Sequence, residues 1–97
     1  MTWEQMFETI KALSDASLKM RSPGDWYVSQ PYVEIKRGIG LDGRYGNGST
    51  PEQAVQDHWR VLTTLAADEV IVLHASTPNE REHFLWNGHR WKKVPKE

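Results

Sequence analysis

Glycines and arginines gather between positions 37 and 50, and this segment holds the residue types best suited to binding. Its glycines are Gly38, Gly40, Gly43, Gly46 and Gly48. A helix-start signature, Ser49-Thr50-Pro51, follows them directly. The first-turn N–H groups of a helix lack intrahelical partners and lie at the positive end of the helix dipole, so oxygen-rich anions favour this position. The sequence therefore predicts a pliable, outward-facing loop that delivers backbone donors to a ligand or partner.

Two kinds of occupant fit this segment. A phosphate or nucleotide would use cationic and hydroxyl side chains beside the helix start, with a tyrosine to stack on a base. A protein partner would contact the same exposed side chains. For either occupant, the candidate binding residues are Lys36, Arg37, Arg44, Tyr45, Ser49 and Thr50. A plain mobile connection is the third interpretation of the same residues.

The better-known phosphate-binding motifs do not account for these glycines. Residues 38–43 match G-x-G-x-x-G, but the dinucleotide fingerprint needs its glycines at the strand-to-helix turn of a parallel βαβ unit. Here the helix begins several residues later, and no second βαβ half follows. No Gly-Lys-Ser/Thr sequence occurs, which excludes a Walker-type loop.

Catalytic and metal-binding patterns are missing. The four histidines have no H-x-x-x-H or His-plus-carboxylate spacing for a tetrahedral metal site, and His58 falls on an apolar helix stripe, where we expect a core histidine. No serine stands in a pattern that would pair it with a base and an oxyanion hole. The absence of cysteine excludes disulfides and thiolate chemistry. We therefore expect no catalytic residue, no metal and no cofactor, and hence a non-enzymatic protein.

Size and charge narrow the remaining classes. Ninety-seven residues form one domain, 1–97, with a single core. The net charge of −1, from 12 basic and 13 acidic residues, argues against nucleic-acid binding through global attraction. No apolar run approaches the roughly 20 residues that span a membrane, and the N-terminus lacks a signal-peptide layout. We expect a cytoplasmic protein.

Two amphipathic helices are predicted. Thr2 and Gln5 form a capping-box pattern before a helix from Trp3 to about Leu13, which could fray on through Leu18 and Met20. Pro51 opens the second helix, with Thr50 as its cap. The apolar stripe of the second helix comprises Ala54, Val55, His58, Trp59, Leu62, Leu65 and Ala66.

The remaining segments indicate strands. Residues 26–28 and 32–36 are extended on either side of Pro31, which predicts an edge strand or two short strands joined by a bend. Residues 69–75 are apolar on both faces, as in a central strand, and a loop at 76–79 follows. The predicted fold class is α+β: an antiparallel sheet of about four strands with two helices packed on one face, in the order α-β-(β)-α-β-β.

The C-terminal segment predicts a hairpin around Asn87-Gly88. A two-residue type I′ turn would pair Trp86 with His89 and Phe84 with Trp91, so the aromatic face would pack on the helices. Aromatic and basic residues interleave here, a pattern that can bind single-stranded nucleic acid; they are Trp86, His89, Arg90, Trp91, Lys92, Lys93 and Lys96. Because the tryptophans and the basic residues would project from opposite faces, this geometry argues against nucleic acid as a partner. Trp86 and Trp91 are alternatively candidates for a dimer or partner interface.

Two segments, 46–55 with Trp59 and 84–88 with Trp91, resemble short phage- and prophage-encoded accessory proteins. The first is also similar to the turn-plus-helix of small α+β modules of the HicB type. The resemblance implies a stoichiometric inhibitor or ligand sponge that acts on host or antiviral machinery, in the host cytoplasm.

We therefore predict a non-enzymatic, homodimeric interaction protein that binds and inhibits a host or antiviral-defence protein. The first alternative is a sponge-like module that binds a nucleotide or another phosphate-containing ligand through residues 36–50. The second alternative is nucleic-acid binding through the C-terminal hairpin.

Overall fold

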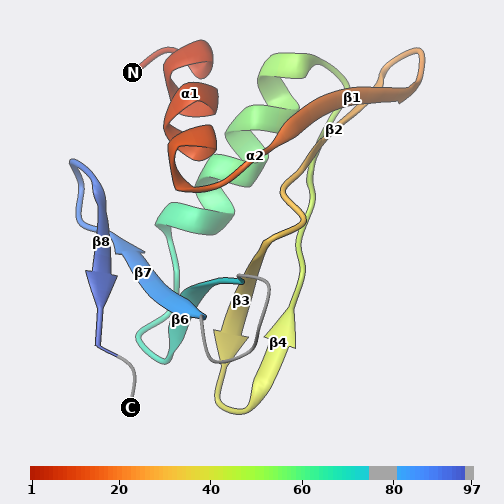
Figure 1. Cartoon of the computed structure of the whole chain (residues 1–97). Helices are drawn as coiled ribbons and strands as arrows, with labels where there is room; N and C mark the ends of the chain where they lie inside the picture. The colour runs from red at the N-terminus through yellow and green to blue at the C-terminus, as the bar shows by residue number, and fades with distance from the viewer. Residues whose placement is uncertain (75–80, 96–97) are drawn as a thin grey trace.

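The computed structural model describes residues 1–74 and 81–95. Within them, the chain forms two helices and eight strands, and the strands make two antiparallel sheets (Figure 1). The α+β prediction is confirmed, but the single sheet of about four strands is wrong. The predicted loop at 76–79 and Lys96 lie outside the described residues.

The elements follow one another as α1 (Trp3–Leu13), β1 (Ser17–Ser22), β2 (Asp25–Ser29), β3 (Val33–Arg37), β4 (Gly40–Asp42), β5 (Gly46–Gly48), α2 (Pro51–Thr63), β6 (Glu69–Leu73), β7 (Glu82–Trp86) and β8 (Trp91–Val94). The three-stranded sheet has the order β1-β2-β5, and the five-stranded sheet has the order β4-β3-β6-β7-β8. The predicted central strand, β6, is indeed the middle strand of the larger sheet.

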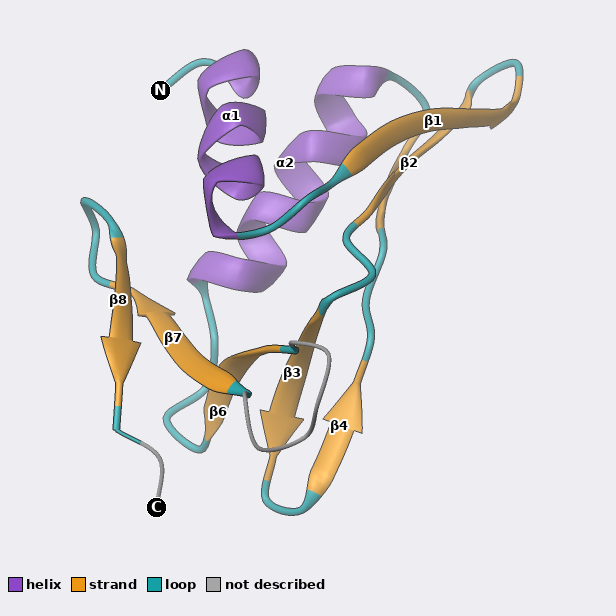
Figure 2. Ribbon diagram, viewed as in Figure 1, coloured by secondary structure: helices purple, strands orange, loops and turns teal. Residues whose placement is uncertain are grey.

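One long, bent hairpin joins the two sheets. β2 pairs with β5 in the smaller sheet, whereas β3 pairs with β4 in the larger one. The chain therefore leaves one sheet near Pro31, turns between β3 and β4, and returns to the first sheet along β5 (Figure 2). The bend at Pro31 is confirmed, since proline cannot donate to a continuous ladder.

Local capping fixes both helix starts as predicted. The Thr2 side chain accepts from the Gln5 N–H while the Gln5 side chain accepts from the Thr2 N–H, and Thr50 caps α2. The extension of α1 through Leu18 and Met20 is wrong, because Ser14 is extended and residues 17–22 form β1.

Segment 37–50 is not the open loop that its glycines suggested, because β4 and β5 occupy six of its residues. β5 lies directly against α2: a Cβ at Gly46 would lie 2.5 Å from the His58 Cβ, and one at Gly48 would lie 2.5 Å from the Ala54 nitrogen. Real Cβ atoms do not approach other atoms this closely. Gly46 and Gly48 are therefore packing residues that let a strand touch a helix backbone.

We expect Gly46→Ala or Gly48→Ala to lower the free energy of unfolding by at least about 2 kcal/mol, because the added methyl must push β5 away from α2. Urea denaturation measures the change. Gly43→Ala is the matched control, since the nearest atom to its new Cβ is the Glu34 Cγ at 4.0 Å. Equal stability of the Gly43 and Gly46 variants would contradict the close-packing role.

The predicted register of the C-terminal hairpin is wrong. Trp86 pairs with Trp91, and Phe84 pairs with Lys93, so residues 87–90 form the connection. A type I′ turn would need positive φ at Asn87, but only Gly88 adopts it. Instead, the Asn87 Oδ1 accepts the N–H groups of His89 and Arg90, each at 2.9 Å. This side-chain acceptor stabilises a longer connection.

A buried polar contact lies where the chain changes sheets. The Gln30 side chain is 3% exposed, and its Nε2 donates to the carbonyls of Ile10 and Ser14, both at 2.9 Å. Its Oε1 lies 2.9 Å from the Nε2 of His58 on α2. Since the amide oxygen can only accept, the histidine nitrogen is the donor. Gln30 thus satisfies the carbonyl end of α1 and links both helices to the β2–β3 bend.

His58 is a core histidine, as predicted, and it is 2% exposed. Burial lowers the pKa of the imidazole from 6.5 to about 4, although the nearby Asp57 carboxylate opposes the shift. The unfolded chain therefore takes up a proton at this imidazole at a higher pH than the folded protein does.

We expect the free energy of unfolding to fall by on the order of 3 kcal/mol as the pH drops from about 6.5 to about 4, because protonation favours the unfolded chain over this range. Urea denaturation at several pH values measures the slope. His58→Gln should flatten it, while His89→Gln, in the exposed hairpin connection, should leave it unchanged. An unchanged slope in His58→Gln would show that other groups produce it.

Candidate functional site

The six predicted binding residues do not form one site. Lys36 and Arg37 lie on β3 near the β3–β4 turn, and Arg44 and Tyr45 lie in the link between β4 and β5. Ser49 and Thr50 lie at the start of α2, at the opposite end of the molecule from the β3–β4 turn (Figure 1). Bending of the hairpin separates these residues, which are neighbours in sequence.

Several donors at the start of α2 already have partners within the chain. The Ser49 N–H donates to the Gln53 Oε1 at 3.0 Å, and the Gln53 N–H donates to the Thr50 Oγ1 at 3.1 Å. The Ser49 hydroxyl also lies 2.5 Å from the Gln53 Oε1. The Gln53 side chain therefore occupies the position where an anion would accept these hydrogen bonds.

Both arginines of the segment form ion pairs at the surface. Arg37 lies 2.9 Å from Glu69, and Arg44 lies 3.0 Å from Asp42. The pKa of Glu69 is lowered, first by a hydrogen bond from the Ala66 N–H and then by Arg37. The Glu69 side chain is only 11% exposed, whereas both side chains of the Arg44–Asp42 pair are exposed. Exposed pairs contribute about 0–1 kcal/mol, so a partner's carboxylate could compete for Arg44.

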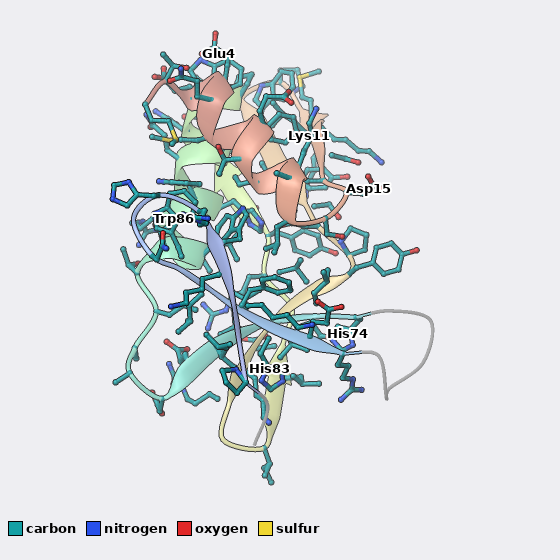
Figure 3. The ribbon with its side chains drawn as sticks, turned by 60° about the vertical axis from the view of Figure 1, so that its left-hand side comes forward. Glu4, Lys11, Asp15, His74, His83 and Trp86 are labelled. Carbon is teal, nitrogen blue, oxygen red and sulfur yellow. The ribbon has the colours of Figure 1, made fainter. Side chains whose placement is uncertain are left out.

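Trp86 and Trp91 pack within the chain. Their rings meet edge to face at 4.9 Å, and each also contacts Trp59 of α2, at 4.9 Å and 5.9 Å respectively. The Trp91 Nε1 donates to the Thr9 carbonyl of α1 at 2.7 Å. The labelled Trp86 lies close to the helices in Figure 3. These three tryptophans, which we call the tryptophan cluster, attach the β7–β8 hairpin to both helices. The aromatic face of the hairpin was predicted to pack on the helices.

Arg21, Tyr27, Tyr45 and Asn47 form a continuous group on the three-stranded sheet, which we call the tyrosine surface. The Tyr27 and Tyr45 rings meet edge to face with centroids 5.9 Å apart. The Arg21 guanidinium lies 4.1 Å from the Tyr27 centroid and 5.9 Å from the Tyr45 centroid. Such stacks are attractive because the ring face is negative. Tyr45 is nevertheless 56% exposed.

Strand register turns the tyrosine surface away from the core. Tyr27 pairs with Lys19 and Asn47, whereas Val28, the next residue along β2, pairs with Leu18 and Gly46. Alternate residues face opposite sides of a sheet, so the fully buried Val28 marks the core side and Tyr27 marks the solvent side.

Hydrogen bonds hold the tyrosine surface in place. The Arg21 Nη1 donates to the Asn47 Oδ1 at 3.0 Å and lies 3.4 Å from the Asp25 Oδ1. The Asn47 N–H donates to the Asp57 carboxylate of α2 at 2.9 Å. The two tyrosine rings and the guanidinium therefore lose little side-chain entropy when a partner binds.

A cavity of about 290 Å³ adjoins Tyr45. It lies between the β2–β3 connection and the β4–β5 link. Gln30 and Val33 line it on one side, and Arg44 and Tyr45 line it on the other. A side chain of a partner could enter here beside the tyrosine surface.

Tyr45 was among the predicted binding residues, whereas Arg21 and Tyr27 were not. The missed signal is the alternation of Leu18, Lys19, Met20 and Arg21, which leads into the turn residues 22–25. Alternation before a Pro-Gly turn indicates a hairpin. A hairpin here would have placed Arg21 near the aromatic residues of 26–28.

Other classes of site gain no geometric support within residues 1–74 and 81–95. No three His, Asp or Glu side chains in that part of the chain gather closely enough to hold a metal ion. No helix described there is long and apolar enough to cross a membrane. Comparison of the chain with protein-family models, curated proteins and solved structures finds no match.

Tyr45→Ala should change the free energy of unfolding by less than about 1 kcal/mol, because the ring is exposed and fills no core space. Trp91→Ala should cost about 3–5 kcal/mol, since it removes a packed ring and leaves a cavity. Chemical denaturation followed by circular dichroism compares the two variants. A large loss of unfolding free energy in Tyr45→Ala would show that the tyrosine surface serves to stabilise the fold.

Proposed function

We propose that this protein is a non-enzymatic interaction module that binds another protein through the tyrosine surface. The observation that carries the proposal is the Tyr27–Arg21–Tyr45 stack, in which Arg21 and Tyr45 are exposed and Tyr27 is half-buried. Tyrosine and arginine are favoured at interface hot spots, where they give large contact areas and directed hydrogen bonds. A surface with both residue types, fixed before binding, suits a protein partner.

The surroundings of the tyrosine surface support the same interpretation. Arg44 is exposed and pairs with the exposed Asp42, so its guanidinium can turn to a carboxylate of the partner. The cavity beside Tyr45 offers room for one anchoring side chain. Complementary pockets and charged rims distinguish specific interfaces from ordinary surface.

A protein partner is favoured over the two alternatives. A phosphate at the start of α2 would have to displace the Gln53 carboxamide. Single-stranded nucleic acid would need exposed rings on the C-terminal hairpin, but Trp86 and Trp91 pack against Trp59. The tyrosine surface, in contrast, needs no rearrangement before it is contacted.

The resemblance to phage accessory proteins favours a host or antiviral-defence protein as the partner, with inhibition by stoichiometric binding as the outcome. Inhibition of this kind requires no catalytic group. It requires an interface that holds the partner while its active surface is blocked.

Affinity capture from a bacterial lysate tests the proposal by comparing three immobilised proteins: the wild type, Tyr45→Ala and Tyr32→Ala. Tyr32 is a matched control, because it is 54% exposed and Tyr45 is 56% exposed, but it lies outside the tyrosine surface. We expect the wild type and Tyr32→Ala to retain the same protein and Tyr45→Ala to lose at least about 90% of it, as expected when a hot-spot ring is truncated.

Folding of each variant is checked by its melting curve before capture. Equal retention by Tyr45→Ala would contradict the proposed surface. Absence of any protein retained by the wild type would contradict the proposed function.

A further inference from the structure

The outer edge of β1 is open to another strand. β1 is an edge strand of the three-stranded sheet, and five of its six residues are exposed. Among the described residues, only β2 pairs with it. The β1–β2 hairpin projects beyond the N-terminal end of α2 (Figure 1). Edge strands carry unpaired backbone N–H and C=O groups, which can pair with an added strand.

Side chains on β1 differ between its two faces. Lys19 is opposite Tyr27 in the strand register, and the Arg21 guanidinium stacks on the Tyr27 ring. Both cations are therefore on the side of the tyrosine surface. Leu18 and Met20 pair with Val28 and Trp26 on the other side, and Met20 is 52% exposed. The edge is thus cationic on one face and apolar on the other.

This pattern disfavours a second copy of the chain as the added strand. Antiparallel pairing of two β1 strands would bring Lys19 and Arg21 close to the same cations of the other copy. Like charges opposite each other destabilise a ladder. A strand with acidic residues on one face and apolar residues on the other would instead satisfy both faces of β1.

We propose that β1 binds an extended segment of a partner protein in which acidic and apolar residues alternate, adding it as a fourth strand to the sheet β1-β2-β5. The acidic side chains lie beside Lys19 and Arg21, and the apolar ones lie beside Leu18 and Met20. This inference rests on the proposed function and names the chemistry of the partner, because the added strand extends the tyrosine surface beyond Arg21.

The other sheet edges fit such a segment less well. β4 has only three residues and begins with Gly40. β8 is also cationic, but it has only four residues and its Trp91 belongs to the tryptophan cluster. β1 is the longest strand and the one that continues into the tyrosine surface.

Fluorescence anisotropy with labelled peptides tests the inference. The probes are a short peptide of alternating Glu and Val, its Lys and Val counterpart, and a Glu and Val peptide interrupted by proline. We expect the full-length protein to prefer the Glu peptide by at least about tenfold over the other two, because charge complementarity and ladder hydrogen bonds both contribute. Amide hydrogen exchange should slow within residues 18–21 when the Glu peptide binds.

Charge reversal supplies the decisive variants. Lys19→Glu with Arg21→Glu should reverse the preference toward the Lys peptide, whereas Lys92→Glu with Lys93→Glu on β8 should leave it unchanged. Tyr45→Ala, which tests the proposed function, should still bind the Glu peptide. Weak or equal binding of all three peptides, or a preference that follows the β8 charges, would overturn the inference whatever the capture experiment gives.

Discussion

The carboxamide of Gln30 is the contact on which the arrangement of this protein depends. Its Nε2 donates hydrogen bonds to the Ile10 and Ser14 carbonyls at the C-terminal end of α1, and its Oε1 accepts one from His58 of α2. It does so at the point where the chain passes from one sheet to the other. Buried amides are costly unless every group is paired, and here three hydrogen bonds meet that requirement. The two helices and the bent hairpin are therefore fixed relative to one another.

Local patterns predicted the helices well. The capping residues Thr2 and Thr50 set the two helix starts. Within the predicted apolar stripe, Ala54, Val55, His58 and Leu62 are buried on α2, whereas Leu65 and Ala66 lie beyond its end. The central strand β6 was also predictable, because a strand that is apolar on both faces must be covered on both faces. These features depend on residues close together in sequence, which is why the sequence alone was sufficient for them.

Features that depend on contacts distant in sequence were missed. The sequence Gly46-Asn47-Gly48 has little strand propensity, and it is extended only because it fits between β2 and the backbone of α2. The register of β7 and β8 depends on one asparagine side chain that accepts two backbone N–H groups. The prediction that residues 36–50 form one binding loop was wrong for the same reason. Arg37, Arg44 and Ser49 are near in sequence, but the bent hairpin carries them to different parts of the molecule.

The alternation of side chains along the segment 45–48 divides it between two roles. Gly46 and Gly48 face α2, where the helix backbone leaves no space for a side chain. Tyr45 and Asn47 belong to the opposite, exposed face. Selection can therefore exchange the outward pair for other residues while the inward pair stays glycine. Substitutions at the outward positions can therefore alter the surface while the packing of β5 against α2 stays the same.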